Sequence, residues 1–415
     1  MRFSSKPALL TALLTALLGL SPHAHAQSDT PWAYRDLGSL GGTFIGPVPP
    51  SVTGAAIGQA FAAKGGSGSF SYSGESIADL GNLGGTSTYF VNANGVVAGH
   101  SNTGGGSDSR AFVYSAGRLT DVGTLGGGSS HVTGLNASGQ VAGYSDTTGN
   151  TSSRAFLYSS GKLTDLGTLG GSYSVASGIN DAGQVVGNAY TTGDASSHAF
   201  LYSAGNMRDL GTLGGSTSFA TAVNSEGFVV GDAYLHGNAA SHAFLYANGQ
   251  MTDIGTLGGS RSTAVAINRV GQAIGNAYTT GDASTRAFSY SGGKLTDLGT
   301  LGGTNSFALG INSSGQIIGT SDVEGDTARH SFLYSDGKML DLSVLFPGLT
   351  NFVADGINDA MQIIGSAVSK SGVLRGLIVT PVPEPDGNGL ALTGLGVVAA
   401  FAWLRRRAAT ARRVG

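Results

Sequence analysis

A segment of the form Asp-Leu-Gly-x-Leu-Gly-Gly recurs along the chain at a nearly constant spacing of 42–44 residues. Its copies begin at Asp36, Asp79, Asp121, Asp165, Asp209, Asp253 and Asp297, with a degenerate copy at Asp341. A fixed period of this length indicates one supersecondary unit copied many times, each copy burying its faces against its neighbours.

The repeat from His198 to Ser241 contains four short stretches that read as β-strands. They are His198–Tyr202, Met207–Leu213, Ser218–Val223 and Phe228–Ala233. Asn224 and Gly227 between the last two suit the first and last positions of a type I turn. Four strands in about 44 residues, joined by tight turns, are typical of a β-propeller blade.

Both faces of these strands are apolar. Successive side chains of a strand point to opposite faces, so Ala199 and Leu201 face one way while Phe200 and Tyr202 face the other. A strand that is apolar on both faces belongs in a sheet packed between two other sheets. This pattern favours stacked blades over an open two-layer sandwich.

The two ends of the repeated region are complementary. Residues 33–37 match a second strand with no first strand before them, and residues 375–379 match a first strand with no second strand after them. The eight first strands are marked by Phe70, Phe112, Phe156, Phe200, Phe244, Phe288, Phe332 and Leu377. We predict an all-β chain whose residues 32–381 form a propeller of about eight four-stranded blades, closed by the C-terminal strand. The alternative is a β-solenoid of the same period.

The first 26 residues have the features of a signal peptide. Arg2 and Lys6 supply positive charge, and residues 8–20 form an apolar run. Ala24 and Ala26 then place small residues where a signal peptidase cleaves. We therefore predict that the protein is exported.

The last segment, residues 382–415, predicts a second targeting signal. Pro383, Glu384 and Pro385 precede an uncharged stretch, residues 387–404, which is just long enough to span a membrane as a helix. A cluster of three arginines follows: Arg405, Arg406 and Arg407. The positive-inside rule predicts that this end of the helix stays in the cytoplasm.

This order of Pro-Glu-Pro, short helix and arginine cluster resembles the PEP-CTERM sorting signal of Gram-negative bacteria. The resemblance implies an exosortase-type processing enzyme as a partner, a transient inner-membrane anchor, and then release to the cell surface or the extracellular space. The alternative is a plain C-terminal membrane anchor.

Copies reading His-Ala-Phe, at His198 and His242, or Arg-Ala-Phe, at Arg110, Arg154 and Arg286, precede the Asp-Leu-Gly segment. They resemble the repeats of the extracellular HAF family, across nearly all of residues 32–380. The resemblance implies an exported repeat protein and assigns it no chemistry.

Composition limits the possible partners. Outside residues 1–26 and 387–415, 15 basic and 25 acidic residues remain, a net charge of about −10. An acidic surface argues against nucleic acid as a partner, because phosphate binding requires clustered Lys and Arg. The absence of cysteine excludes disulfides and thiolate metal sites.

Three groups of side chains are candidates for a site. We expect the repeated Asp to accept backbone N–H bonds, and the His or Arg before Phe to pair with an Asp or carbonyl of a neighbouring blade. The acidic loop containing Asp322, Glu324 and Asp326 is the best candidate for calcium, although it matches no known calcium motif. We predict no other cofactor or metal.

No catalytic motif is present, and the sequence analysis therefore predicts that the protein is not an enzyme. Two functions remain. One is a non-catalytic structural or interaction role in the exopolysaccharide layer, with polysaccharide or other surface proteins as partners. The other is a lectin-like module that binds glycan through its loops. Few loop residues are aromatic, Tyr173 and Phe219 among them, which favours the first function.

Overall fold

The computed structural model describes residues 32–37, 44–47, 56–61, 67–73, 76–79, 87–102, 108–346 and 348–382. The chain divides into two compact units. One comprises Tyr34–Val379, and the other comprises residues 1–33 with residues 380–415. Only residues 32–33 and 380–382 of the second unit are described.

The described residues form 32 β-strands, which pair into eight four-stranded antiparallel groups. Sheet 1 contains β2 (Phe44–Pro47), β3 (Ala56–Phe61), β4 (Ser67–Ser73) and β5 (Ser76–Asp79). Sheet 2 contains β6 (Ser87–Val91), β7 (Val97–Asn102), β8 (Ser109–Ser115) and β9 (Arg118–Asp121). Sheet 3 contains β10 (Gly126–Leu135), β11 (Val141–Thr147), β12 (Ser153–Ser159) and β13 (Lys162–Asp165). Sheet 4 contains β14 (Gly170–Ile179), β15 (Val185–Thr191), β16 (Ser197–Ser203) and β17 (Asn206–Asp209).

The other four sheets repeat this plan. Sheet 5 contains β18 (Gly214–Val223), β19 (Val229–Leu235), β20 (Ser241–Ala247) and β21 (Gln250–Gly255). Sheet 6 contains β22 (Gly258–Ile267), β23 (Ala273–Thr279), β24 (Thr285–Ser291) and β25 (Lys294–Asp297). Sheet 7 contains β26 (Gly302–Ile311), β27 (Ile317–Val323), β28 (Arg329–Ser335) and β29 (Lys338–Asp341). Sheet 8 contains β30 (Leu349–Ile357), β31 (Ile363–Ser369), β32 (Leu374–Pro381) and, from the other end of the chain, β1 (Trp32–Asp36).

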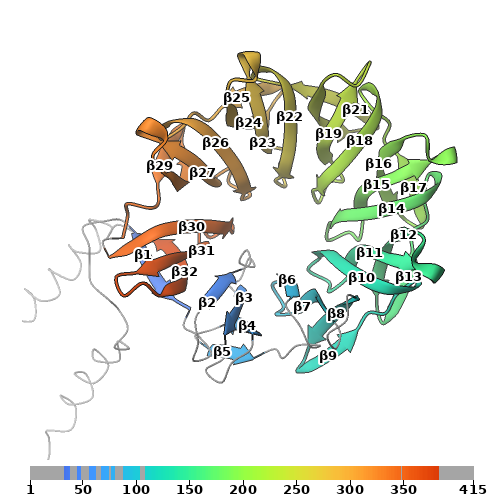
Figure 1. The fold of residues 1–415 in the computed structure, drawn as a ribbon, viewed down its shortest axis with the longest axis horizontal. Helices are drawn as coiled ribbons and strands as arrows, with labels where there is room; N and C mark the ends of the chain where they lie inside the picture. Colours follow the sequence, from blue (N-terminus) through green and yellow to red (C-terminus); the bar gives the residue numbers. More distant parts are fainter. Residues whose placement is uncertain are drawn as a thin grey trace, which may run out of the picture. The chain divides into compact units, whose positions relative to one another are not determined.

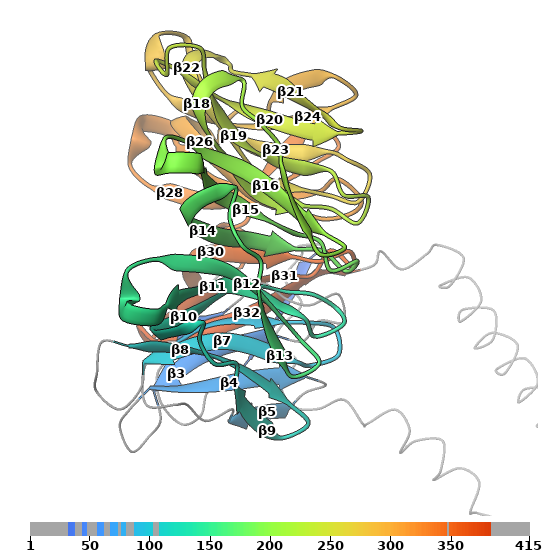
Figure 2. The same ribbon diagram turned by 90° about the vertical axis from the view of Figure 1, so that its right-hand side faces the viewer.

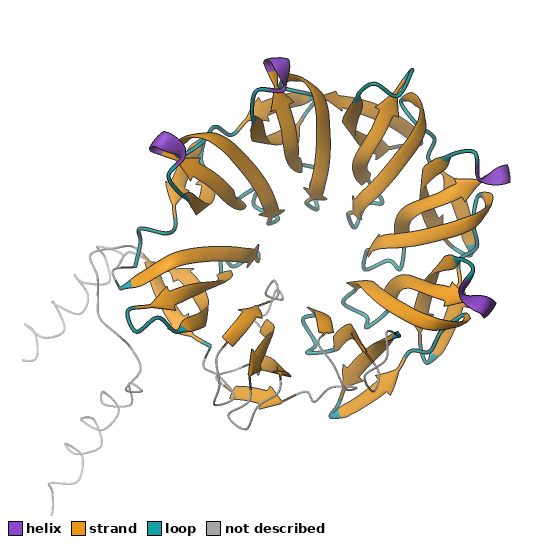
Figure 3. Cartoon of the chain, viewed as in Figure 1, coloured by secondary structure: helices purple, strands orange, loops and turns teal. Residues whose placement is uncertain are grey.

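Short 3-10 helices follow the second strand of four sheets (Figure 3). They are η1 (Thr148–Asn150), η2 (Thr192–Asp194), η3 (Thr280–Asp282) and η4 (Glu324–Asp326). Figure 3 shows them on loops at the periphery of the Tyr34–Val379 unit, and each contacts the first strand of its own sheet.

Each sheet straddles two sequence repeats. Sheet 5 begins at the third strand of one repeat, β18, and ends at the second strand of the next, β21. Single parallel bridges connect sheets 4, 5 and 6, at Ser197–Thr217 and Ser241–Arg261. The four strands that we expected in each repeat are present, but each folded sheet takes two of them from the following copy.

The sheets succeed one another within the Tyr34–Val379 unit. The first strand of each sheet packs against the first strand of the next from β6 to β30, while β3 contacts β6 and β2 contacts β31. Figure 1 shows this circular order, and Figure 2 shows sheets 3, 4 and 5 following one another in the side view. The arrangement is β-propeller-like, and the prediction of an all-β chain is confirmed.

The two ends of the repeated region meet in sheet 8. β1 pairs with β32, and the Leu37 N–H donates to the Gly376 carbonyl at 2.8 Å. The side chain of Leu37 is buried with Ile364 and Ile378. This pairing of the end strands is the one expected from the sequence, and it does not fit the open-ended solenoid considered as the alternative.

The core lies between the sheets because the strands are apolar on both faces. Ala199 and Phe200 of β16 are both fully buried, one on each face. Phe200 lies opposite Gly187 of β15, where a Cβ atom would come within 2.9 Å of the Phe200 ring and 1.9 Å of the Val175 carbonyl oxygen. The repeated glycine of the second strand is therefore required by the close approach of its neighbours.

A row of buried asparagines connects sheets 2 to 8, at the turn between the first and second strands of each of these sheets. The Asn180 side-chain amide donates to the Asn224 carbonyl of the next sheet at 2.7 Å, and its Oδ1 accepts the Gln184 N–H at 2.9 Å. The same side-chain-to-carbonyl bond joins the copies in sequence: Asn92, Asn136, Asn180, Asn224, Asn268, Asn312 and Asn358. Each asparagine thus fixes its own turn and its neighbour.

The predicted targeting segments lie outside the described residues. These are the signal peptide with Ala24 and Ala26, the helix 387–404, and the sorting residues Pro383, Glu384, Pro385, Arg405, Arg406 and Arg407. Within the described part of the chain, no helix is long and apolar enough to cross a membrane.

Candidate functional site

The repeated Asp of the Asp-Leu-Gly segment holds its own sheet together. Asp209 on β17 accepts the Gly211 N–H at 2.7 Å and lies 2.9 Å from Nδ1 of His198 on the adjacent strand β16. Five further pairs have this geometry: Arg110–Asp121, Arg154–Asp165, His242–Asp253, His330–Asp341 and Arg375–Asp36. The expected pairing with a neighbouring blade was therefore wrong, because both partners belong to one sheet.

Asp326, one of the three calcium candidates, closes a loop. Its backbone is left-handed, with φ of 54°, and its carboxylate accepts the Thr304 N–H at 2.7 Å and the Thr304 hydroxyl. Asn150 and Asn238 do the same at their own positions, accepting the N–H groups of Gly128 and Ser216. A neutral amide performs the same function, so the position does not require a charge.

Asp322 is turned toward other partners. Its carboxylate accepts bonds from Arg329 Nε and the Asn305 side-chain amide, both at 2.8 Å. The hydrogen bond from Arg329 is the main cause that lowers the pKa of Asp322. In the parts of the chain that the structure describes, no three His, Asp or Glu side chains lie where they could hold a metal ion. Asp322 thus lies in β27 and Glu324 and Asp326 in η4, and the three side chains do not converge.

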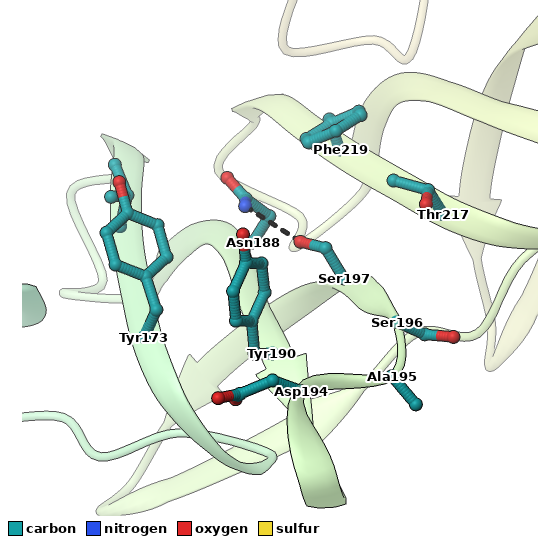
Figure 4. A pocket seen from close by; sticks show the side chains of 10 residues that line it. Tyr173, Asn188, Tyr190, Asp194, Ala195, Ser196, Ser197, Thr217 and Phe219 are labelled. Atoms are coloured by element: carbon teal, nitrogen blue, oxygen red, sulfur yellow. Dashed lines mark hydrogen bonds between the residues drawn. The ribbon is translucent and has the colours of Figure 1, made fainter. Parts of the chain in front are cut away.

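An open cavity of about 590 Å³ lies between sheets 4 and 5 (Figure 4). It is lined by Tyr173 and Val175 of β14, Asn188 and Tyr190 of β15, Asp194 to Ser197 before and in β16, and Thr217 and Phe219 of β18. It combines aromatic rings with small polar groups, a composition typical of ligand sites.

The aromatic rings of the cavity are partly accessible. Tyr190 is 36% exposed and Phe219 38% exposed. The rings of Tyr173 and Tyr190 lie side by side with centroids 5.4 Å apart. Figure 4 shows Phe219 on the opposite wall, across from Tyr190 and Asn188.

The polar groups of the cavity are held in place by neighbours. The Asn188 amide donates to the Ser197 hydroxyl at 3.0 Å. The Asp194 carboxylate accepts the Ser172 N–H at 2.7 Å and the Ser172 hydroxyl at 2.9 Å. None of the ten described residues that line the cavity is Lys or Arg. The cavity therefore suits a neutral ligand with many hydroxyl groups better than an anionic one.

The equivalent positions elsewhere in the repeat do not reproduce this cavity. Sheet 6 carries Arg261 and Thr263 where sheet 5 carries Thr217 and Phe219. In sheet 7 the corresponding Phe307 is covered by the Arg329 guanidinium, 4.7 Å from the ring centroid. The cavity thus breaks the repeat symmetry, as a binding site usually does.

The sequence analysis had noted Tyr173 and Phe219 as loop residues, but both lie in strands, β14 and β18. It missed Tyr190 and Asn188 because both belong to an ordinary-looking strand. Their spacing of two residues was the available signal, since it places both side chains on one face.

Two carboxyl groups outside the cavity are strongly perturbed. Burial raises the pKa of Asp355 to about 7, and its Oδ2 is buried without a hydrogen-bond partner. Burial also raises the pKa of Asp232 to about 6, although the nearby Arg261 opposes that change. Both groups belong to first or second strands and face neighbouring sheets.

Comparison with known proteins gives structural similarity only. No protein-family profile and no curated protein sequence matches the chain. Solved structures similar to it include dipeptidyl peptidase 4 of Porphyromonas gingivalis, with 10% identity, a TM-score of 0.49, and coverage of 77% of this chain and 56% of that chain. Acylaminoacyl peptidase of Pyrococcus horikoshii has 9% identity and a TM-score of 0.43, with coverage of 79% of this chain and 57% of that chain. TolB of Acinetobacter baumannii has 10% identity and a TM-score of 0.35, with coverage of 84% of this chain and 80% of that chain.

The presence of peptidases among these structures contradicts the prediction that the chain is not an enzyme, and that prediction is withdrawn. It rested on missing sequence motifs, whereas catalytic groups can be brought together by a fold without any local motif. The chain spans a little over half the length of the two peptidase chains, and the similarity assigns it no substrate and no catalytic residue.

Proposed function

We propose that the protein is an exported repeat protein that is sorted to the cell surface and acts by binding in the exopolysaccharide layer. In this proposal the eight sheets are the blades of a propeller, and β1 completes the last blade. The terminal segments provide the targeting, through signal cleavage after Ala26 and exosortase-type processing near Pro383 to Pro385. The net charge of about −10 over residues 27–386 supports a soluble extracellular module.

The specific activity we propose is glycan binding in the cavity between sheets 4 and 5. The observation that supports it is that partly exposed aromatic rings, Tyr190 and Phe219, line the same cavity as neutral hydrogen-bonding groups. A sugar presents an apolar ring face and a rim of hydroxyls. The ring face can stack on an aromatic side chain while the hydroxyls bond to Asn188 and Thr217.

Calcium is not needed for this mode of binding, because the acidic loop of Asp322, Glu324 and Asp326 is distant in sequence from the cavity and its Asp side chains already have partners. A calcium-dependent lectin remains the alternative form of the proposal. The two forms differ in their response to a chelator.

The deciding experiment measures binding of the full chain, purified in a detergent without sugar headgroups, to the exopolysaccharide of its own host. We expect saturable binding that is unchanged by chelator and that falls about tenfold or more for Phe219→Ala. Phe307→Ala is the matched control, since Phe307 occupies the same repeat position but lies under Arg329. Absence of binding would contradict the glycan proposal, and loss of binding in chelator would favour the calcium-dependent form.

Sorting is tested separately. Replacing Pro383, Glu384 and Pro385 together by Ala should leave unprocessed protein in the inner membrane. Release of mature protein at the normal level from this variant would contradict the sorting proposal without affecting the binding proposal.

A further inference from the structure

The cavity is one end of a longer row of ring side chains that crosses four consecutive sheets. The row begins at His100 in β7 of sheet 2, whose ring lies 4.8 Å from that of His131 in β10 of sheet 3. His131 stacks on Tyr144, with centroids again 4.8 Å apart and planes inclined by 21°. His131 and Tyr144 are register partners on β10 and β11, so the strand pairing itself fixes this stack.

Tyr173 continues the row into sheet 4. Strand β14 packs against β11 of sheet 3. Burial raises the pKa of the Tyr173 hydroxyl, and the charges of Tyr144, Tyr190 and Asp146 raise it further. The row then passes through Tyr190 and ends at Phe219 on sheet 5, on the far wall of the cavity.

The six rings carry little charge near neutral pH. Burial, aided by the charge of His131, lowers the pKa of His100 to about 4, and burial lowers the pKa of His131 as well. Both imidazoles are therefore mainly neutral when the phenol groups are also neutral. Acidic groups beside the row include Asp146, near Tyr144 and His131, whose carboxylate accepts the Ser153 hydroxyl, and Asp194, which lines the cavity.

The same face of the following sheets has a different chemistry. Asp232 of sheet 5 is close to Arg261 of sheet 6, and Asp322 of sheet 7 is paired with Arg329, which also covers Phe307. Tyr234 and Tyr278 occupy the position of Tyr190 in sheets 5 and 6, but ionic groups accompany the rings on this face from sheet 5 to sheet 7. This difference in side chains does not come from the backbone, because the first and second strands pair in the same register in sheet 4 and in sheet 6.

We infer that this row binds a neutral polysaccharide chain along several consecutive sugar rings, with the cavity as one subsite at its end. The inference rests on the proposed glycan-binding function and adds the class of ligand, an extended neutral polymer instead of a single sugar or an anionic glycan. The rings of His100, His131 and Tyr144 follow one another at 4.8 Å and those of Tyr173 and Tyr190 lie 5.4 Å apart, which provides apolar surfaces along sheets 2 to 4 beside which sugar rings can lie. A cavity alone would hold one or two sugar units.

Length dependence of binding tests this inference. Size-graded fragments of the host's own exopolysaccharide, from one to about eight sugar units, are titrated into the full chain by calorimetry. Affinity should rise by about tenfold or more from one unit to the longest fragments, the effect of one or two additional stacking contacts. His131→Ala should reduce this gain most for the longest fragments, whereas Phe219→Ala should weaken fragments of every length.

The outcomes separate the two proposals. Phe307→Ala, at the covered position in sheet 7, should bind every fragment as the unmodified chain does, and circular dichroism should confirm that all three variants are folded. Affinity that does not depend on length, together with equal binding by His131→Ala, would overturn the extended row and leave the cavity as a single site. Binding of no fragment by the unmodified chain would overturn the glycan-binding function itself.

Discussion

The Arg375 guanidinium donates a hydrogen bond to the Asp36 carboxylate at 3.0 Å, although the two residues are 339 positions apart. In five other sheets the same basic residue and Asp are only 11 positions apart. The pair in sheet 8 is therefore the ordinary one, divided between the two ends of the repeated region. β1 supplies the strand that the C-terminal copy lacks.

Burial of Leu37, more than this ion pair, should hold the two ends together. Leu37 is 1% exposed, whereas the Arg375 and Asp36 side chains are 42% and 39% exposed. Leu37→Ala should lower the free energy of unfolding by about 2–5 kcal/mol. Arg375→Ala should lower it by about 1 kcal/mol or less, because water screens an exposed pair.

Urea denaturation followed by tryptophan fluorescence measures both values, and Arg110→Ala provides the matched control for a pair within one continuous segment. An equal cost for Arg375→Ala and Leu37→Ala would show that the ion pair, and not burial, joins the ends.

Replacing the side-chain amide of a buried asparagine between two sheets by a carboxylate should destabilise the protein. In Asn180→Asp the carboxylate would face the Asn224 carbonyl and the Gln184 side-chain oxygen, each now 2.7 Å from the amide. We expect a loss of about 2–3 kcal/mol in the free energy of unfolding, because buried acceptors lose their donor and meet another acceptor. The exposed Asn206, whose amide bonds within its own turn, is the control: Asn206→Asp should cost about 0.5 kcal/mol or less.

The glycine opposite each core phenylalanine should be as necessary as the phenylalanine. Phe200→Ala removes a fully buried ring and should cost about 3–5 kcal/mol. Gly187→Ala should cost a similar amount, because its Cβ would meet the Val175 carbonyl oxygen at 1.9 Å. Because that contact is with backbone, removing the Phe200 ring in a double variant should not restore stability.

Gly178→Ala is the matched control for Gly187→Ala. A Cβ atom at Gly178 would come no closer than 3.5 Å to its neighbours, which is ordinary van der Waals contact. Thermal melting of the two alanine variants therefore separates steric conflict from a general effect of replacing glycine. A melting temperature of Gly187→Ala close to that of the unmodified chain would show that β15 can shift away from β14.

The period and the strand pattern were sufficient to predict the all-β fold, the four strands per repeat and the pairing of the end strands. Asp36 and Arg375 matched the second-strand and first-strand copies well enough to predict where the ends meet. Which four consecutive strands form one sheet was not predictable in this way, because a periodic sequence is the same wherever a repeat is taken to begin. It is decided by the hydrogen bonds between β19 and β20, which join the last strand of one copy to the first strand of the next in a single sheet.

The candidate site was less accessible to sequence analysis for a related reason. Tyr173, Tyr190 and Phe219 come from three strands, and their proximity depends on how two sheets pack. The acidic loop drew attention because Asp322 and Asp326 are close in sequence, yet Asp322 lies in β27 and Asp326 in η4, where they bind different partners. Proximity in sequence therefore predicted a site at the acidic loop, where the side chains do not converge, and gave no indication of the cavity between sheets 4 and 5.

Asp355 should make the stability of the protein fall as pH rises through neutrality. Its pKa is raised from 3.8 to about 7 in the folded protein, so the folded chain holds this proton more tightly than the unfolded chain does. The stabilising contribution is complete below about pH 4 and is lost as the pH rises to 7, on the order of 2–4 kcal/mol in all. Asp232, whose pKa is raised to about 6, acts in the same direction.

Asp355→Asn removes the titrating group while keeping its shape. Urea denaturation from pH 4 to pH 8 should show the variant to be more stable than the unmodified chain above pH 7, with the difference disappearing toward pH 4. Asp336→Asn, in an exposed turn, should follow the unmodified chain across the whole range. A constant difference between Asp355→Asn and the unmodified chain at every pH would show that the Asp355 carboxyl does not change its proton affinity on folding, because only a pKa that differs between the two states makes stability depend on pH.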